Sequence, residues 1–289
     1  MPLTEAPGQG RLVDIGDTRL FVVERSQEGP PLIVLHGGPG LDHWAFADYL
    51  DPLAVETRLI LVDQRGHGLS DPSPSETWTL GQLARDVVDL AAALELDSYA
   101  VLGHSFGGFV ALQLALDHPD ALRRLVCSCT VPSAGWLEGI QERIDQLEPP
   151  ELRERVRWGW DNEGGSDEQF LAALEAQLPF HFADPEDSAI AEYLRRSAGG
   201  VPRPGAAEHF AATGFDGFDL EERLGDIRIP TLVLAGRHDR TCPPEASELL
   251  AERIPDAELA VLERSAHMPF VEETERYLDA VRRFVAGPG

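Results

Sequence analysis

A serine flanked by glycines stands where an apolar run gives way to a helical pattern. Ser105 is the centre of the motif Gly-His-Ser-Phe-Gly at residues 103–107. The apolar residues 99–103 lead into this motif, and the helix-forming residues 106–118 follow it. The glycines allow a tight strand-to-helix turn, which lifts the serine oxygen and points a helix N-terminus at it. The pattern predicts that Ser105 is a nucleophile that attacks a carbonyl carbon.

A serine hydroxyl is a weak nucleophile and needs a base that takes its proton. Asp239 follows the apolar residues 231–235, and His267 follows the apolar residues 259–262. The carboxyl ends of parallel strands meet at one edge of a sheet, so both side chains are expected near Ser105. We predict that His267 is the base and that Asp239 orients its imidazole and stabilises the charged form.

The negative oxygen that forms during such an attack needs backbone N–H donors. Phe106 directly follows the nucleophile, and we expect its N–H to be one donor. Gly38 lies in the Gly-Gly-Pro-Gly loop after residues 32–36, and we expect its N–H to be the other. Gly37 beside it is expected to contact the substrate, because glycine lets a backbone approach a ligand closely.

The residues with predicted chemistry follow strands of a longer alternating pattern. Continuous apolar runs are typical of strands buried on both faces of a parallel sheet. Residues 80–94 carry apolar side chains at helical spacing after Thr79, a good N-cap. The predicted strands are residues 12–15, 20–24, 32–36, 59–63, 99–103, 125–129, 231–235 and 259–262, and the last helix spans residues 272–285. Strands that alternate with helices predict an α/β fold with a mostly parallel, doubly wound sheet.

The middle of the chain lacks a clear buried strand. Between about residues 133 and 218, charge is dense and aromatic residues such as Trp136 are scattered. We expect residues 133–218 to form a helical cap over a catalytic core made of residues 1–132 and 219–289. Trp136 is expected to contact the substrate from this cap.

Composition excludes several classes of protein. The formal net charge of −26 repels phosphate backbones and anionic lipids, so we expect neither nucleic acid nor membrane partners. There is no lysine, which excludes Schiff-base enzymes and a phosphate-binding Gly-Lys-Ser/Thr loop. No apolar run reaches the roughly 20 residues that span a bilayer. The polar residues 1–10 have no basic and apolar signal pattern, so a cytoplasmic location is expected.

Metal and cofactor signals are also missing from the sequence. The three cysteines, Cys127, Cys129 and Cys242, have no zinc-site spacing and are expected to be buried, reduced thiols. No dinucleotide fingerprint follows the first buried strand, because Pro39 stands where a helix would open. We therefore expect no metal and no cofactor. The sequence does not predict the oligomeric state.

Three motifs together resemble one enzyme family. They are His-Gly-Gly-Pro-Gly at residues 36–40, Asp-Gln-Arg-Gly-His-Gly-Leu-Ser at residues 63–70 and Gly-His-Ser-Phe-Gly-Gly at residues 103–108. This set is similar to that of the proline iminopeptidases (prolyl aminopeptidases), which are α/β-hydrolases. The resemblance implies a cofactor-free serine hydrolase that releases an N-terminal residue from small peptides through an acyl-enzyme.

The resemblance also implies a substrate contact and shows two departures. In the family, acidic groups of the cap bind the free α-amine, and Glu208 in Ala-Glu-His-Phe resembles one of those carboxylates. Arg240 follows Asp239 where relatives carry a second glutamate, and it would attract an anionic group. Phe106 replaces the usual tryptophan.

Two other functions stay open on the sequence alone. A carboxylesterase or lactonase that acts on a small metabolite would use the same predicted triad, and Arg240 favours it. A non-catalytic ligand receptor could share the fold, although all three triad positions are filled. A serine at position 105 argues against dehalogenases and epoxide hydrolases, whose nucleophile is an aspartate.

Overall fold

One eight-stranded sheet organises the computed structural model, which describes residues 10–287. The strand order is β1-β2-β4-β3-β5-β6-β7-β8. The pairs β1–β2 and β2–β4 are antiparallel, and every other neighbouring pair is parallel. The strands are β1 (Arg11–Asp14), β2 (Arg19–Glu24), β3 (Pro31–Leu35), β4 (Arg58–Val62), β5 (Ala100–His104), β6 (Arg124–Ser128), β7 (Thr231–Gly236) and β8 (Ala257–Leu262).

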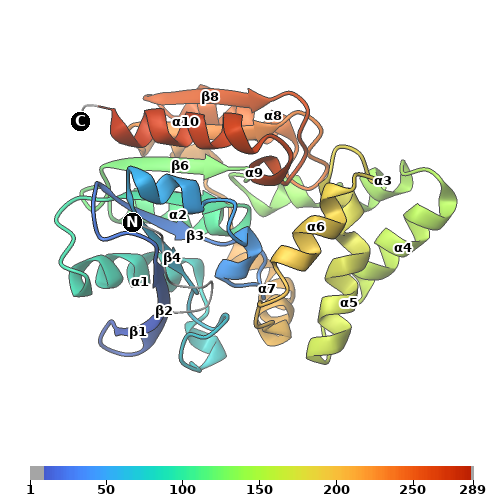
Figure 1. Ribbon diagram of the computed structural model, residues 1–289, viewed down its shortest axis with the longest axis horizontal. Helices are drawn as coiled ribbons and strands as arrows, with labels where there is room; N and C mark the ends of the chain where they lie inside the picture. Colours follow the sequence, from blue (N-terminus) through green and yellow to red (C-terminus); the bar gives the residue numbers. More distant parts are fainter. Residues whose placement is uncertain (1–9, 288–289) are drawn as a thin grey trace.

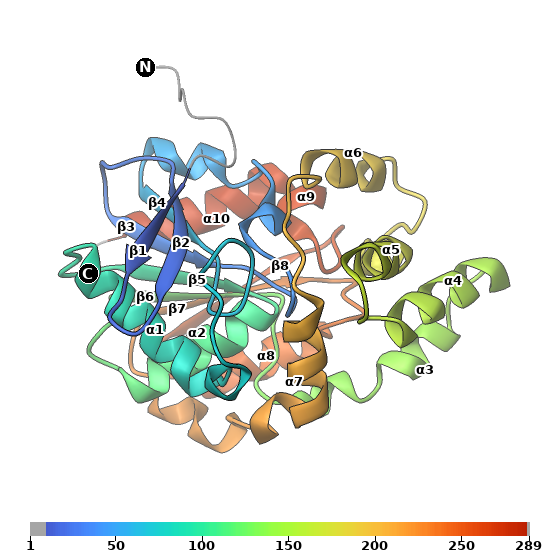
Figure 2. The ribbon, with the colours of Figure 1, turned by 90° about the horizontal axis from the view of Figure 1, so that it is seen from below.

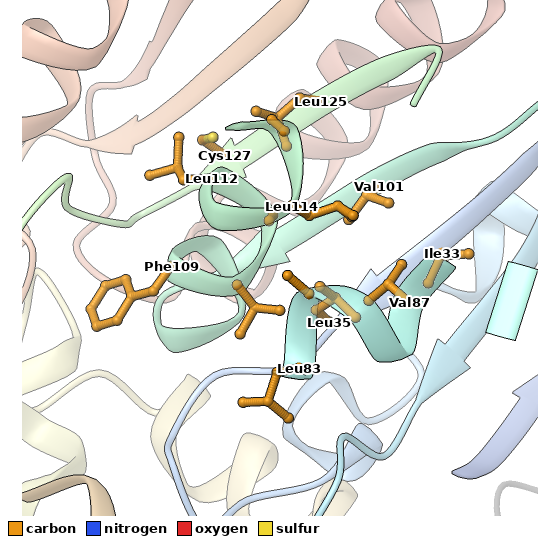
Figure 3. Close-up of a cluster of buried hydrophobic side chains, with 14 of the residues drawn as sticks. Ile33, Leu35, Leu83, Val87, Val101, Phe109, Leu112, Leu114, Leu125 and Cys127 are labelled. Atoms are coloured by element: carbon orange, nitrogen blue, oxygen red, sulfur yellow. The ribbon is translucent and has the colours of Figure 1, made fainter. Parts of the chain in front are cut away.

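Apolar side chains cover both faces of the sheet. Successive residues of a strand point to opposite faces, so Ile33 and Leu32 enter different clusters. Figure 3 shows the first cluster, in which Ile33 and Val101 of the sheet lie with Leu83 and Phe109 of the helices. Burial on both sides is why these strands are continuously apolar.

Helices pack on each face. On the first face lie α1 (Leu80–Ala93), α2 (Phe106–Asp117) and α8 (Pro244–Arg253), and on the second lies α10 (Thr274–Ala286). Thr79 caps α1 as predicted, since its side chain accepts a hydrogen bond from the N–H of Gln82 at 3.2 Å. The short helices η1 (His43–Phe46), η2 (Asp51–Val55) and η3 (Ser75–Thr77) follow β3 and β4.

Helices fill the chain between β6 and β7. The elements are η4 (Ala134–Leu137), α3 (Ile140–Asp145), α4 (Pro150–Asp161), α5 (Asp167–Gln177), η5 (Leu178–His181), α6 (Ala189–Arg196), α7 (Pro204–Gly217) and η6 (Glu221–Asp226). The chain leaves and returns at one place, because Ala134 N–H donates to Phe218 O and Leu220 N–H donates to Pro132 O, each at 2.9 Å. In Figures 1 and 2, α3 to α6 lie together on one side of the sheet, and in Figure 1 the arrows of β3, β6 and β8 point toward that side.

The predicted fold class is confirmed, and the predicted elements lie close to their expected bounds. Each predicted strand is present within two residues of its expected bounds. The helix expected at residues 272–285 is α10, which spans residues 274–286, and the short helix α9 (Pro269–Glu272) precedes it. The chain breaks at Glu273, whose buried carboxylate accepts hydrogen bonds from the N–H of Arg264 and the hydroxyl of Ser265. An exposed helical glutamate could not make these contacts.

The helices of the described chain do not meet the requirements of a bilayer span, since none is both long and apolar enough. The sequence predicts that residues 1–10 carry no signal pattern. Nine of these residues, 1–9, lie outside the described part of the chain.

Candidate active site

Ser105 sits on the sharp turn between β5 and α2. Its backbone has φ 51° and ψ −118°, a conformation that L-residues rarely adopt and that marks strain at a turn. Ser105 N–H donates to Ser128 O at 2.9 Å, and Gly108 N–H donates to Ser105 O at 2.8 Å. A side chain at Gly103 would overlap the carbonyl oxygen of Gly107, so the turn requires a glycine there. The turn is therefore held from both the sheet and the helix.

His267 and Asp239 are brought together from two strand ends. His267 Nδ1 lies 2.8 Å from Asp239 Oδ2, and both side chains are buried. The other oxygen of Asp239 accepts hydrogen bonds from the N–H of Thr241 at 2.8 Å and of Cys242 at 2.9 Å. Three contacts thus fix the carboxylate, which in turn fixes one nitrogen of the imidazole.

Ser105 and His267 line one cavity, together with Gly37 and Gly38. Its volume is about 670 Å³, which is in the range of small-molecule sites. A Cβ added at Gly37 would come within 3.3 Å of the Ser105 Cβ, so the glycine loop lies directly against the predicted nucleophile. Gly38 has φ +116° and precedes a cis bond to Pro39, and only glycine adopts that φ without strain.

Phe106 begins α2, so its N–H is one of the first four of the helix, which have no acceptor within the helix. Its ring is buried and packs edge-on against Phe210 of α7, with centroids 4.8 Å apart. The side chain therefore serves packing between α2 and α7, while the backbone N–H stays at the turn beside Ser105.

Three other residues singled out in the sequence do not line this cavity. Glu208 is exposed on α7, where its carboxylate accepts a hydrogen bond from the N–H of Gly165 at 2.8 Å. Trp136 donates its indole N–H to Glu221 at 2.8 Å. Arg240 donates to the carbonyl oxygen of Phe182 at 2.7 Å. The expectation that Arg240 attracts an anionic substrate is therefore corrected, because its guanidinium is engaged by backbone carbonyls.

The cavity instead contains acidic residues that the sequence analysis did not identify. Glu163 lies in the loop between α4 and α5, and burial raises its pKa to about 7 despite a 2.5 Å hydrogen bond from Gln177. Asp42 lies after the glycine loop, and burial together with the charge of Asp63 raises its pKa to about 6. Neither residue was marked by a motif or by a helical or strand periodicity, so only the folded structure shows that they line the cavity.

His181 of η5 was also missed. Its ring centroid lies 5.2 Å from that of His267, and its Nδ1 lies 2.8 Å from the hydroxyl oxygen of Thr241. Burial, and then the nearby His267, lower the pKa of His181 well below its usual value, so this ring is neutral. A neutral ring beside His267 avoids a repulsion with the imidazolium that would form there.

Two clusters of possible metal ligands lie in the described part of the chain, each with its ligand atoms within 4.8 Å of one another. They are Cys129, Asp239 and His267, and Asp42, His43 and Asp63. In the first cluster both oxygens of Asp239 are engaged in hydrogen bonds, and burial raises the pKa of the Cys129 thiol well above its usual value. In the second cluster all four carboxylate oxygens already accept hydrogen bonds from N–H groups. Hydrogen bonds thus engage the carboxylates of both clusters.

Comparison with known proteins gives a consistent result. The model of the alpha/beta hydrolase fold family matches residues 30–274. A proline iminopeptidase of Heyndrickxia coagulans is 31% identical over 265 residues, which is 89% of this chain and 91% of that protein. The crystal structure of a proline iminopeptidase from Mycobacterium smegmatis aligns with a TM-score of 0.74 at 25% identity, over 96% of this chain and 97% of that one. An N-acyl homoserine lactone degrading enzyme aligns with a TM-score of 0.70 at 26% identity, over 95% and 100% of the two chains.

Proposed function

Because this chain belongs to the proline iminopeptidase family within the alpha/beta hydrolases, we propose that it is a serine aminopeptidase that releases an N-terminal residue from short peptides. The observation that carries the proposal is the shared cavity of Ser105 and His267, with Asp239 hydrogen-bonded to the far nitrogen of His267. That arrangement supports a nucleophile, a base and an orienting acid in the roles that acyl transfer needs.

In the proposed mechanism, Ser105 Oγ attacks the carbonyl carbon of the N-terminal residue while His267 takes the hydroxyl proton. The N–H groups of Gly38 and Phe106 stabilise the negative oxygen of the tetrahedral adduct. His267 then gives the proton to the leaving amine, and the C–N bond breaks to leave an ester on Ser105. Water, deprotonated by His267, hydrolyses that ester. Asp239 keeps the imidazole in the required tautomer and stabilises its cationic form.

The ammonium group of the substrate is proposed to bind Glu163. This carboxyl lines the cavity, whereas Glu208 is exposed and engaged elsewhere. A carboxylate in a partly buried site gives an ammonium a charge-assisted hydrogen bond. Glu208 contributes indirectly, because it accepts the N–H of Gly165 and so holds the loop that carries Glu163.

We further propose that residues 133–218 act as the cap of a core formed by residues 1–132 and 219–289. Support comes from the cavity lining, which includes Trp160 and Leu174 of the helical segment as well as Gly38 and Ser105 of the core. A substrate in this cavity would be enclosed from both sides, which limits its contact with bulk water.

A second candidate is hydrolysis of a small ester or lactone by the same triad. The exposed position of Glu208 favours it, since the carboxylate that resembles the family's amine ligand does not line the cavity. The aligned N-acyl homoserine lactone degrading enzyme shares the fold over nearly the whole chain.

The experiment compares L-proline 4-nitroanilide and other aminoacyl 4-nitroanilides with 4-nitrophenyl acetate and butyrate. We expect turnover of at least one free-amine anilide, and loss of about 10³-fold or more in kcat for Ser105→Ala. Ester turnover without any anilide turnover would contradict the peptidase and favour the second candidate. Activity that survives in Ser105→Ala would exclude both.

A further inference from the structure

The segment of residues 180–183, at the end of η5, lies between the two loops that carry Asp239 and His267. Phe180 and Phe182 are buried, so the segment is anchored by its side chains. Its backbone groups hydrogen-bond to residues of both catalytic loops. These contacts join the helical segment to the predicted triad.

On the His267 side, one carboxylate joins two pieces of backbone. Glu272, the last residue of α9, accepts the N–H of Ala266 at one oxygen and the N–H of Ala183 at the other, each at 2.8 Å. The N–H of His267 itself donates to the carbonyl oxygen of His181 at 3.0 Å. The backbone of His267 is thus tied to the segment directly and, through Glu272, one residue earlier.

On the Asp239 side, Arg240 holds the same segment. Its guanidinium donates to Phe182 O at 2.7 Å and to Ala183 O at 3.3 Å. The carbonyl oxygen of Arg240 accepts a 2.6 Å hydrogen bond from Arg143. Arg240 is therefore fixed at its backbone and at its side chain, immediately after the predicted catalytic acid.

We propose that Glu272 and Arg240 are positioning residues. They act through the 180–183 segment to hold His267 and Asp239 at the positions that catalysis by Ser105 requires. The inference rests on the proposed triad. It assigns to Arg240 a role within the fold in place of contact with an anionic substrate. A carboxylate is needed at position 272 because the two N–H groups lie on different segments and each needs an acceptor oxygen. Glutamine offers one acceptor oxygen and would turn an NH₂ group toward the other N–H.

The test measures kcat and KM together with the rate at which a fluorophosphonate probe labels Ser105. Glu272→Gln is expected to lower kcat and the labelling rate about tenfold or more, since small misplacements of catalytic groups have effects of this size. KM should stay within about twofold, because Glu272 does not line the substrate cavity. Glu275→Gln, an exposed glutamate on α10, is the matched control and should change nothing.

Arg240→Met is the second variant, because it loosens the segment while Glu272 stays intact. It should show the same loss in kcat and labelling at nearly constant KM, with the folded fraction checked by circular dichroism. Unchanged kcat and labelling in a folded Glu272→Gln protein would overturn the inference and leave the proposed function standing. The same holds if Glu272→Gln fails to fold and Arg240→Met behaves as the parent protein does. A parent protein that the probe does not label at Ser105 would overturn the proposed function, and the inference with it.

Discussion

At the scale of single residues, Glu163 is the proposed ligand of the substrate's ammonium group. Burial raises its pKa to about 7, so it is a carboxylate above that pH and a neutral acid below it. Only the carboxylate form attracts an ammonium group. We therefore expect KM for L-proline 4-nitroanilide to rise several-fold as the pH falls from about 8 to about 6, over which the carboxylate fraction falls about tenfold. Steady-state kinetics across this range, with neutral 4-nitrophenyl butyrate as the reference substrate, measures the effect.

Glu163→Gln should remove this pH dependence and raise KM at pH about 8 toward the value seen at low pH. Glu175→Gln is the matched control, because Glu175 lines the same cavity but is exposed. If the Glu163→Gln protein keeps the parent's pH profile, the ammonium group binds elsewhere.

The three residues of the predicted triad were each tied to a strand end, unlike the predicted substrate contacts Trp136 and Glu208. Ser105, Asp239 and His267 each follow a continuous apolar run, and the alternation of strands and helices places such positions at one edge of the sheet. Glu163 follows a helix in the middle of the chain, where no comparable rule fixes its direction. Its place in the cavity depends on how α4 and α5 pack on the core, which is tertiary information.

At the scale of elements, the end of β7 must lie close to the loop that carries His267. A Cβ added at Gly236 would overlap the carbonyl oxygen of Ala266, so glycine is required where this strand meets that loop. Gly236→Ala should destabilise the protein by about 1–3 kcal/mol, because overpacking against backbone forces the elements apart. Urea unfolding measures the loss, and kcat should fall because the loop carries the predicted base.

Gly81→Ala is the control for this substitution. Gly81 lies in the first turn of α1 with no atom within 4 Å of an added Cβ. Alanine favours the helix, so this variant should be neutral or more stable by about 0.5–1 kcal/mol. A Gly236→Ala protein as stable as Gly81→Ala would show that β7 and the His267 loop tolerate separation.

The elements themselves were predictable where one rule governs a whole segment. The inner strands β3 to β7 are buried on both faces, and their continuous apolar runs identified them. The strands at the two edges of the sheet, β1 and β8, are partly exposed and were also predicted. The final helix was predicted at residues 272–285 and is α10, at residues 274–286. The short helix α9 before it was not predicted, and Glu273 between the two helices hydrogen-bonds to residues 264–265, partners that no local pattern contains.

At the scale of the whole molecule, the net charge of −26 gives the protein a negative field. A substrate with a free ammonium group is concentrated by this field, whereas a neutral ester is not. Salt shortens the range of the field from about 30 Å at 0.01 M to about 3 Å at 1 M. We expect kcat/KM for L-proline 4-nitroanilide to fall a few-fold over this range, and kcat/KM for 4-nitrophenyl butyrate to stay nearly constant. An equal fall for both substrates would show that salt acts on the folded structure and not on the attraction of the ammonium. If kcat/KM falls for neither substrate, the net charge does not contribute to substrate preference.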